Sequence, residues 1–163
     1  MTEDRYSFRK VTRNDLAMLA EWQARPHVRE WWESDEPYTE ADLASPRTRR
    51  WIVEWQGQPF AFMQDYDPHG WATHHFGHLP EGSRGIDQFI GVEAMLGRGH
   101  GSGFIAQRMR ALFAAGAPVI GTDPHPENAR AIAVYRKVGF LPAGPVRDTE
   151  WGLVLPMEAK TPG

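Results

Sequence analysis

The alternation of apolar and polar positions near the start of the chain predicts a strand and a following helix. Residues 6–11 (YSFRKV) alternate as a half-buried strand does. Thr12, with Asp15 three residues later, is typical of a capping box, and apolar residues then recur at helical spacing until Pro26. Two shorter helices are expected beyond this proline, at 27–32 and, capped by Thr39, at 38–45.

Strand patterns dominate the middle of the chain. Residues 50–55 and 60–66 are apolar runs on either side of the sequence QGQP, and this arrangement indicates a β-hairpin. Residues 67–84 are polar and irregular, and a connection of this length is more typical of a functional loop than of a simple turn. The apolar run at 85–92 predicts a further strand.

Two longer helices are expected in the second half of the chain. The first covers 103–115 with apolar residues on one side, and the second covers 128–140, where Gly139 is the expected terminating residue. Strands are expected at 118–122, around 140–145 and at 149–157. This order of elements predicts a mixed α/β fold.

The composition is that of an ordinary globular protein, and it excludes several classes of function. The chain has 163 residues, 41% hydrophobic and 24% charged, which predicts one domain over 1–163. It contains no cysteine, so disulfides and thiolate metal sites are impossible and a cytoplasmic location is expected. The net charge is -3 and no apolar run approaches the roughly 18 residues of a membrane span. Neither nucleic acid nor a membrane is therefore an expected partner.

The sequence LGRGHGSG at 96–103 places four glycines at alternate positions ahead of a predicted helix. Each glycine weakens a helix by about 1 kcal/mol relative to alanine, so the run indicates that something must lie close against the backbone. The free N–H groups and the dipole of a helix N-terminus suit a diphosphate. The spacing differs from the GxGxxG dinucleotide pattern and from the P-loop, so an ordinary glycine-rich turn is the alternative.

Further segments carry a family resemblance. FIGVEAMLGRGHGSGFI followed by NARAIAVYRKVGF is similar to the acetyl-CoA-binding core of the GNAT family of N-acetyltransferases. LAMLAEW, VREWW, GQPFAFMQDY, RGIDQFI and TDPHPENARAIAVYRKVGF extend the resemblance to the aminoglycoside 6'-N-acetyltransferases, from about residue 7 to 142. The resemblance implies the GNAT fold, in which a mostly antiparallel twisted sheet splays at a β-bulge and is flanked by helices.

The resemblance also implies acetyl-CoA as the co-substrate, with no metal. In that family, the loop matching 97–102 holds the diphosphate through backbone N–H groups, and the preceding strand seats the pantetheine arm. The residues expected to bind it are Phe89, Ile90, Val92, Gly97, Arg98, Gly99, His100, Gly101, Ser102, Asn128 and Tyr135. The family signature usually has Gln or Arg where this chain has Leu96, so Arg98 is expected to contact a phosphate instead.

Acetyl transfer to an amine needs a group that removes a proton from the ammonium form. Asp87 interrupts an apolar strand run, and it matches the proposed general base of the aminoglycoside enzymes; a salt-bridged aspartate is the alternative. Asp123 ends a predicted strand and matches a residue that binds the amine, although Asp-Pro also starts ordinary turns. Tyr135 matches the tyrosine that protonates the departing thiolate, or it is a packed helix aromatic. A backbone N–H near Phe89 or Ile90 would stabilise the oxyanion.

The expected acceptor site is aromatic and acidic, because aromatic faces and carboxylates suit a cation. Its expected residues are Trp31, Trp32, Asp65, Tyr66, Asp87 and Asp123. The segment equivalent to 72–80 is acidic in the aminoglycoside enzymes, whereas here it reads ATHHFGHLP. This departure weakens the case for a polycationic acceptor and leaves the acetyl-transfer machinery untouched.

Four histidines, His69, His74, His75 and His78, lie in or beside this segment. They lack the spacing of a zinc site and are expected to contact substrate or to face water. Their protonation near pH 6.5 would make the loop repel cationic acceptors as the pH falls.

The sequence as a whole predicts an N-acetyltransferase that acts by direct attack of a small-molecule amine in a ternary complex, most like the 6'-acetylation of aminoglycosides. An N-acyltransferase for a siderophore precursor or a peptide amine is one alternative. A non-catalytic acyl-CoA-binding module is another. A monomer or a homodimer is expected.

Overall fold

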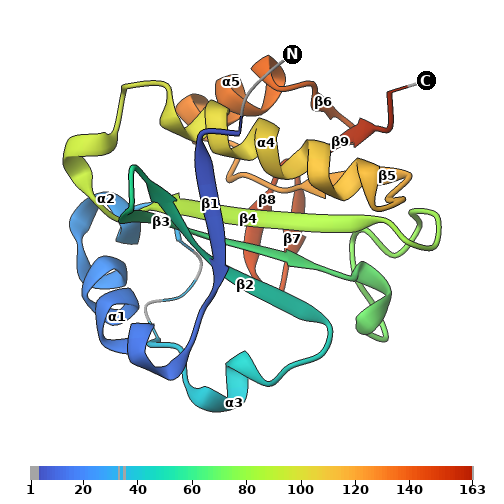
Figure 1. Ribbon diagram of the computed structural model, residues 1–163. Helices are drawn as coiled ribbons and strands as arrows, with labels where there is room; N and C mark the ends of the chain where they lie inside the picture. The colour runs from blue at the N-terminus through green and yellow to red at the C-terminus, as the bar shows by residue number, and fades with distance from the viewer. Residues whose placement is uncertain (1–3, 33, 35, 163) are drawn as a thin grey trace.

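A mostly antiparallel sheet lies at the centre of the computed structural model, which describes residues 4–32, 34 and 36–162. Its strands are β1 (Tyr6–Lys10), β2 (Thr48–Trp55), β3 (Gln58–Tyr66), β4 (Arg84–Ile90), β5 (Val119–Thr122), β6 (Leu141–Pro142) and β9 (Met157–Lys160). Their order is β1-β2-β3-β4-β5-β9-β6 (Figure 1). All neighbours are antiparallel except β4 and β5, which run parallel. β7 (Arg147–Thr149) and β8 (Gly152–Val154) form a separate hairpin.

Helices cover both faces of this sheet. Between β1 and β2 lie η1 (Arg13–Asp15), α1 (Leu16–Ala24), α2 (Pro26–Arg29) and α3 (Glu40–Leu43). The later elements are η2 (Pro68–Gly70), η3 (Glu93–Met95), α4 (His100–Ala114) and α5 (Ala129–Lys137). Figure 1 shows α4 running along the sheet with α5 beside it, whereas α1 and α2 lie apart from both. No helix of the described residues is both long and apolar enough to cross a membrane.

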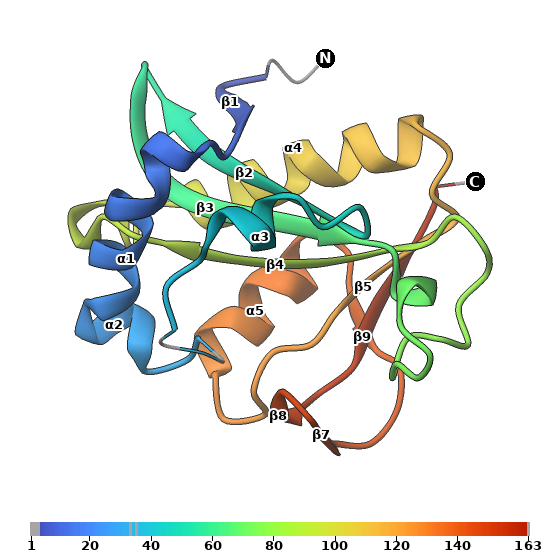
Figure 2. The ribbon, with the colours of Figure 1, turned by 90° about the horizontal axis from the view of Figure 1, so that it is seen from below.

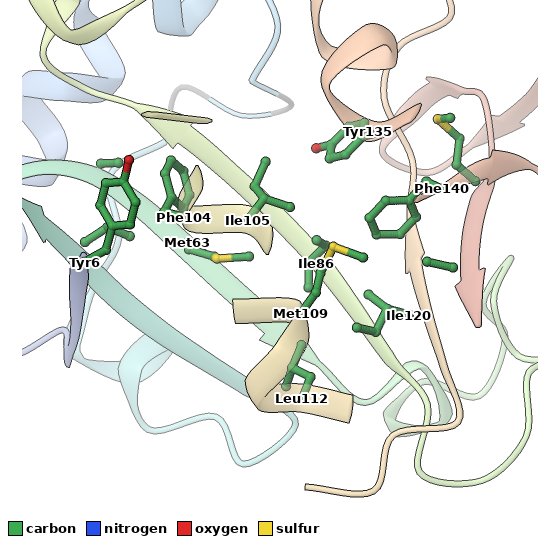
Figure 3. Close-up of a cluster of buried hydrophobic side chains, with 14 of the residues drawn as sticks. Tyr6, Met63, Ile86, Phe104, Ile105, Met109, Leu112, Ile120, Tyr135 and Phe140 are labelled. Carbon is green, nitrogen blue, oxygen red and sulfur yellow. The ribbon is translucent and has the colours of Figure 1, made fainter. Parts of the chain in front are cut away.

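The alternation of side chains along the strands determines which helices each residue meets. Ile52, Phe62 and Phe89 lie opposite one another on three strands and pack in one buried cluster with residues of α1 and α2. Val53 and Ala61 point to the other face and pack with α4. Figure 3 shows this second cluster, in which α4 contributes Phe104, Ile105, Met109 and Leu112.

β4 and β5 diverge after a short stretch of pairing. Only the first two residues of β4 pair with β5 in the described sheet. Beyond the far end of β4, the N–H groups of Gly91 and Val92 both donate to the carbonyl of Phe60, at 2.8 and 3.2 Å, which defines a β-bulge. The expected splayed sheet with a bulge is therefore confirmed, and most of this edge of β4 has no strand beside it.

Several predicted caps are confirmed. The N–H of Thr12 donates to Asp15 Oδ2 at 2.8 Å in the predicted capping box. Thr39 caps α3, and Gly139, with a φ of 112°, follows the last turn of α5. The hairpin turn lies at 56–57, where both residues have positive φ, as a type I' turn requires.

The start of α4 differs from its prediction. The helix begins at His100 rather than at 103, because Gly99 adopts a φ of 84° and takes the N-cap position. Gly103 then lies inside the helix, where a Cβ would come within 2.6 Å of the Tyr6 hydroxyl. This close approach explains why the helix tolerates a glycine there.

The C-terminal segment is more divided than predicted. The strands expected at 140–145 and 149–157 are replaced by β6, the β7–β8 hairpin and β9. Prolines at 142, 145 and 156 cannot donate to a strand ladder, so they interrupt the pairing. Figure 2 shows the hairpin standing apart from the seven-stranded sheet.

Candidate active site

Two cavities meet where β5 ends. The larger has a volume of about 660 Å³ and extends along β4, the first turns of α4 and α5. The smaller has a volume of about 300 Å³ and lies between α3, β2, β3 and the loop that follows β3. Asp87, Asp123 and Trp151 line both cavities, so two ligands could meet at these side chains.

Asp87 occupies the middle of β4. The register places Arg50, Gln64 and Asp87 opposite one another on β2, β3 and β4, so the three side chains share one face of the sheet. Gln64 Nε2 donates to Asp87 Oδ2 at 2.9 Å. Burial, and then the adjacent Asp123 carboxylate, raise the pKa of Asp87 well above its ordinary value. A carboxyl group with a raised pKa is a better acceptor for the proton of an ammonium ion.

Asp123 directly follows β5 and contacts a buried histidine. His75 Nε2 lies 2.7 Å from Asp123 Oδ2, and only 2% of the His75 side chain is exposed. Burial, and then the charge of Arg147, lower the pKa of His75 to about 4. The imidazole is therefore neutral at neutral pH and donates its Nε2–H to the carboxylate. A neutral donor orients Asp123 without cancelling the negative charge that acts on Asp87.

Tyr135 lies on α5 and borders the larger cavity. Its hydroxyl accepts a hydrogen bond from Gln88 Nε2, and its ring packs against Phe140 in the buried cluster shown in Figure 3. Burial is the main cause that raises the pKa of Tyr135 above its ordinary value. The hydroxyl therefore keeps its proton at neutral pH and can donate it within the cavity.

The glycine-rich loop forms an open N-terminus for α4. Gly97 and Gly99 have φ values of 69° and 84°, which residues with a Cβ rarely adopt. No atom lies within 4 Å of the position that a Cβ at Gly99 would take, and Gly101 borders the larger cavity. The first N–H groups of an α-helix have no acceptor within the helix. The loop therefore fits the diphosphate of coenzyme A.

Other predicted cofactor-binding side chains have different surroundings. The His100 ring points inward, with Nδ1 3.0 Å from the Tyr6 hydroxyl, so its backbone N–H is the group left to face a phosphate. Ser102 Oγ donates to a backbone carbonyl of the loop at 3.2 Å. Arg98 is exposed beside the loop, and Val92 packs against the buried clusters rather than lining a cavity.

Asn128 caps α5 as predicted. Its Oδ1 accepts from the N–H of Ala131 at 3.2 Å, and the residue borders the larger cavity. The cap holds the N-terminus of α5 at the cavity wall.

The sheet register decides which N–H groups of β4 face the larger cavity. The N–H of Gly91 donates to the carbonyl of Phe60 on β3. In an antiparallel pair, the backbone N–H groups that bond to the neighbouring strand belong to every second residue, so the N–H of Phe89 also points towards β3. The N–H groups of Gln88 and Ile90 point the other way, and both residues line the larger cavity. Of the two residues predicted for the oxyanion contact, Ile90 therefore has the suitable direction.

The aromatic residues predicted for the acceptor are divided between the two cavities. Trp31 and Trp32 border the larger cavity, where Trp31 lies against His125 and Trp32 packs on Phe89. Tyr66 borders the smaller cavity. The structure does not bring these rings to a single pocket.

Asp65 faces the opposite side of the sheet from Asp87. Its carboxylate is fully buried and accepts hydrogen bonds of 2.8 Å each from Trp51, Arg84 and Arg108. Burial opposes its ionisation, but the charge and hydrogen bond of Arg108, with the other donors, outweigh burial and lower the pKa of Asp65. Asp65 lines neither cavity, so the substrate contact expected from the sequence is replaced by a structural ion-pair network.

The remaining histidines of the 67–84 loop also have partners. His69 Nε2 contacts a backbone carbonyl at 2.9 Å, and His78 Nε2 lies 3.0 Å from Glu158. The His74 ring stacks on His75, and burial is the main cause that lowers the pKa of His74 to about 4. The predicted protonation near pH 6.5 is therefore wrong for His74 and His75. In the described part of the chain, no group of three or more acidic or histidine side chains could hold a metal ion.

Four residues at or beside the site were not predicted: Gln64, His75 as a partner of Asp123, Gln88 and Trp151. Strand alternation could have identified Gln64, because it lies two residues before Tyr66 and shares its face. His75 and Trp151 come from an irregular loop and a short turn. No periodic pattern in the sequence places such residues.

The chain matches the model of a known protein family. A family model described as "Acetyltransferase (GNAT) domain" matches residues 11–147. The chain therefore belongs to the GNAT acetyltransferase family and is an enzyme of that class.

Aminoglycoside acetyltransferases are among its curated relatives. The chain is 33% identical over 160 residues to the aminoglycoside N(6')-acetyltransferase type 1 of Klebsiella pneumoniae, and the match covers 89% of this chain and 78% of that protein. The enzyme of the same name from Serratia marcescens matches equally well. A kanamycin resistance protein of Rhizobium radiobacter is 41% identical over 66 residues, which cover 40% of this chain and 61% of that protein.

Solved structures of an aminoglycoside acetyltransferase are also similar to this chain. The aminoglycoside acetyltransferase AAC(6')-Ib in complex with coenzyme A has a TM-score of 0.86 at 32% identity, covering 95% of this chain and 94% of that one. The same enzyme with coenzyme A and kanamycin has a TM-score of 0.85 over the same shares of both chains.

Proposed function

We propose that this protein transfers the acetyl group of acetyl-CoA to the 6'-amine of an aminoglycoside. The observation that carries the proposal is the junction of the two cavities, where Asp87 and Asp123 border both. The larger cavity fits acetyl-CoA and the smaller one an acceptor. The acceptor class is supported by the named activity of relatives that are 32–33% identical over most of the chain.

The proposed binding of acetyl-CoA depends on backbone groups. The N–H groups at the start of α4 hold the diphosphate, and the glycines at 97, 99 and 101 leave the loop free of obstructing side chains. The unpaired edge of β4 then accepts the pantetheine arm. The N–H of Ile90 stabilises the carbonyl oxygen as it becomes negative, a contact worth roughly 3 kcal/mol in other enzymes.

The proposed activation of the amine depends on the carboxylate pair. An ammonium group between Asp87 and Asp123 compensates the repulsion that raises the pKa of Asp87. Asp87 then takes a proton from the ammonium, and the free nitrogen attacks the thioester carbonyl. His75 keeps the Asp123 carboxylate oriented towards this position.

The departing sulfur needs a proton. Tyr135 borders the larger cavity and holds its proton at neutral pH, so we assign it the role of donor to the thiolate. Gln88 donates to the tyrosine oxygen, and Thr122 is a second side-chain hydrogen-bond partner of this hydroxyl, so the two residues hold it in position.

The remaining features of the proposal concern the chain as a whole. We propose one domain over 1–163 and a cytoplasmic location, which suits a chain without cysteine. The proposal is compatible with a monomer or a homodimer.

The test is acetyl-CoA-dependent thiol release with kanamycin, followed by location of the acetyl group on the product by NMR. We expect release with 6'-amino compounds and none with a matched aminoglycoside that carries a hydroxyl group at the 6' position. Acetylation at another amine would contradict the position that we propose. Binding of coenzyme A in calorimetry without thiol release from any amine would identify a non-catalytic binding module.

A further inference from the structure

Two positive charges border the smaller cavity together with the carboxylate pair. Arg47 directly precedes β2, Arg50 lies within it, and both line the cavity with Asp87 and Asp123. We infer that this cavity contains an anion subsite, and that amines carrying a carboxylate are acetylated in preference to matched amines without one. The inference rests on the acetyl transfer proposed above and names a further acceptor class for the same site.

The sheet register sets the span of such an acceptor. Arg50, Gln64 and Asp87 lie opposite one another on three adjacent strands and share the face that borders the cavity. Adjacent strands are about 4.8 Å apart, so the Arg50 and Asp87 backbones are separated by about 10 Å. A short ω-amino acid therefore has the length to place its amine at Asp87 and its carboxylate at Arg50.

Arg50 is held in place and keeps one unused donor. One of its terminal nitrogens donates to the carbonyl of Asp42, and its guanidinium carbon lies 5.1 Å from the centroid of the Tyr38 ring. Its Nε is buried and has no hydrogen-bond partner among the described residues. Buried donors are nearly always paired in proteins, so this atom points to a ligand oxygen.

Arg47 is positioned by an aromatic ring. Its guanidinium carbon lies 4.0 Å from the centroid of the Trp71 ring, which also borders the cavity. Arg47 Nη1 donates to the carbonyl of Gly70 at 3.4 Å, and stacking leaves the other edge N–H groups of the guanidinium for hydrogen bonds to a carboxylate. The second arginine of the wall is thus partly preorganised for an anion.

Arg47 and Arg50 differ from the other arginines near the sheet in their ion pairs among the described residues. Within the described residues, no ion pair joins Arg47 or Arg50 to an acidic side chain, whereas Arg84 and Arg108 are both paired with Asp65. The Asp42 carboxylate also borders the smaller cavity, but it accepts the capping-box hydrogen bonds of Thr39, at 2.8 and 3.1 Å. The positive charge of the wall is therefore available to a ligand.

Besides the two arginines, His74 and the carboxyl groups of Asp42, Asp87 and Asp123 border the cavity, so the positive charge is local to the wall formed by Arg47 and Arg50. His74 is neutral near pH 7, because burial lowers its pKa to about 4. The two guanidinium groups attract a carboxylate, while Asp87 and Asp123 bind the amine of the same acceptor. The volume of about 300 Å³ is at the lower end of the range for small-molecule sites and suits a compact acceptor.

The experiment compares two amines that differ only in the anion, 6-aminohexanoate and hexylamine, with kanamycin as the reference acceptor. For the wild-type chain, we expect kcat/KM for 6-aminohexanoate to exceed that for hexylamine by about tenfold or more, as a charged hydrogen bond gives. In the Arg50→Gln and Arg47→Gln variants, this ratio falls towards one. Arg50→Lys keeps the charge and retains part of the ratio.

The matched control is Arg13→Gln, which removes one exposed positive charge far from both cavities and leaves the ratio unchanged. Equal kcat/KM values for the two amines in the wild-type chain would overturn the anion subsite while kanamycin acetylation persists. If no amine is acetylated, the proposed function fails, and calorimetry of 6-aminohexanoate against the coenzyme A complex decides the subsite separately. Binding that is equally strong in wild type and Arg50→Gln would then overturn it.

Discussion

Asp65 and Asp87 are two aspartates on neighbouring strands of one sheet with opposite electrostatic surroundings. Asp65 points towards α4 and is bound by Arg84 and Arg108, which lower its pKa. Asp87 points to the other face, where the Gln64 amide donates to it, and where burial and then the Asp123 carboxylate raise its pKa. An aspartate in an apolar strand run therefore has a structural or a chemical role according to the face of the sheet on which it lies.

The difference follows from charge compensation. A carboxylate that is already paired with guanidinium groups has little tendency to accept a proton, so Asp65 stabilises the fold and is a poor base. A carboxylate that lacks a cation and lies beside another carboxylate binds an ammonium group and accepts its proton. The two aspartates should therefore respond differently to the same substitution.

The largest difference is expected in catalysis. Asp87→Asn should lower kcat for acetylation of kanamycin by about 10²- to 10⁴-fold, the usual contribution of a general base. Asp65→Asn should leave kcat per folded molecule within a few-fold of wild type. Thiol-release assays measure both rates, and calorimetry should show an unchanged Kd for coenzyme A in Asp87→Asn. A normal rate in Asp87→Asn would exclude it as the base.

The next largest effect is on stability, where the substitution of Asp65 should matter more than that of Asp87. Asp65→Asn leaves buried guanidinium groups without their carboxylate, and breaking a buried ion pair costs about 3–5 kcal/mol. We expect a Tm about 10 °C lower for this variant. Asp87→Asn removes an uncompensated carboxylate and should keep or raise the Tm. Thermal unfolding of the three proteins side by side gives the comparison, and an unaltered Tm in Asp65→Asn would contradict it.

A smaller effect on catalysis is expected when His75 is substituted, because this residue contacts Asp123 and not the substrate. His75→Gln should lower kcat/KM for kanamycin by about tenfold, because one oriented hydrogen bond to the carboxylate is lost or misplaced. His78→Gln is the matched control, since this imidazole lies in the same loop but is exposed and contacts Glu158. A further readout is the pH profile, which should shift in His75→Gln alone. Equal losses in both variants would indicate a general effect of the loop.

The smallest effect concerns the pH dependence of stability. Because the folded pKa of Asp87 is raised, the folded state holds a proton that the unfolded chain releases near pH 4. Asp87 therefore reduces stability as the pH rises above about 4. Relative to wild type, Asp87→Asn should therefore gain stability as the pH rises from about 4.5 to 7, measured as a growing difference in Tm. A constant difference across this range would contradict the raised pKa.

Much of the fold could be predicted because its signals are local. The capping boxes at Thr12 and Thr39 and the hairpin turn depend on residues within a few positions of one another, and they formed as predicted. The predicted bounds of α4 and of the C-terminal strands were less accurate. The left-handed conformation of Gly99 sets the start of α4, and three prolines set the ends of the C-terminal strands. Apolar periodicity does not predict either effect.

The candidate site was predicted in part. Asp87, Asp123 and Tyr135 were identified because the motifs around them resemble those of the GNAT family, and the structure places all three at the larger cavity. The prediction that Asp65 and Tyr66 both line the acceptor site was wrong for Asp65, because adjacent residues of a strand point to opposite faces of the sheet. His75 reaches Asp123 across 48 positions of the chain, and such a contact depends on tertiary packing alone.

A crystal structure of the chain with coenzyme A and kanamycin tests most directly whether the start of α4 binds the diphosphate and whether Asp87 and Asp123 bind the amine. We expect the diphosphate at the backbone N–H groups of residues 99–102 and the 6'-nitrogen within about 3.2 Å of a carboxylate oxygen of Asp87 or Asp123. A 6'-nitrogen with neither carboxylate in reach, or a diphosphate bound away from the start of α4, would contradict this expectation.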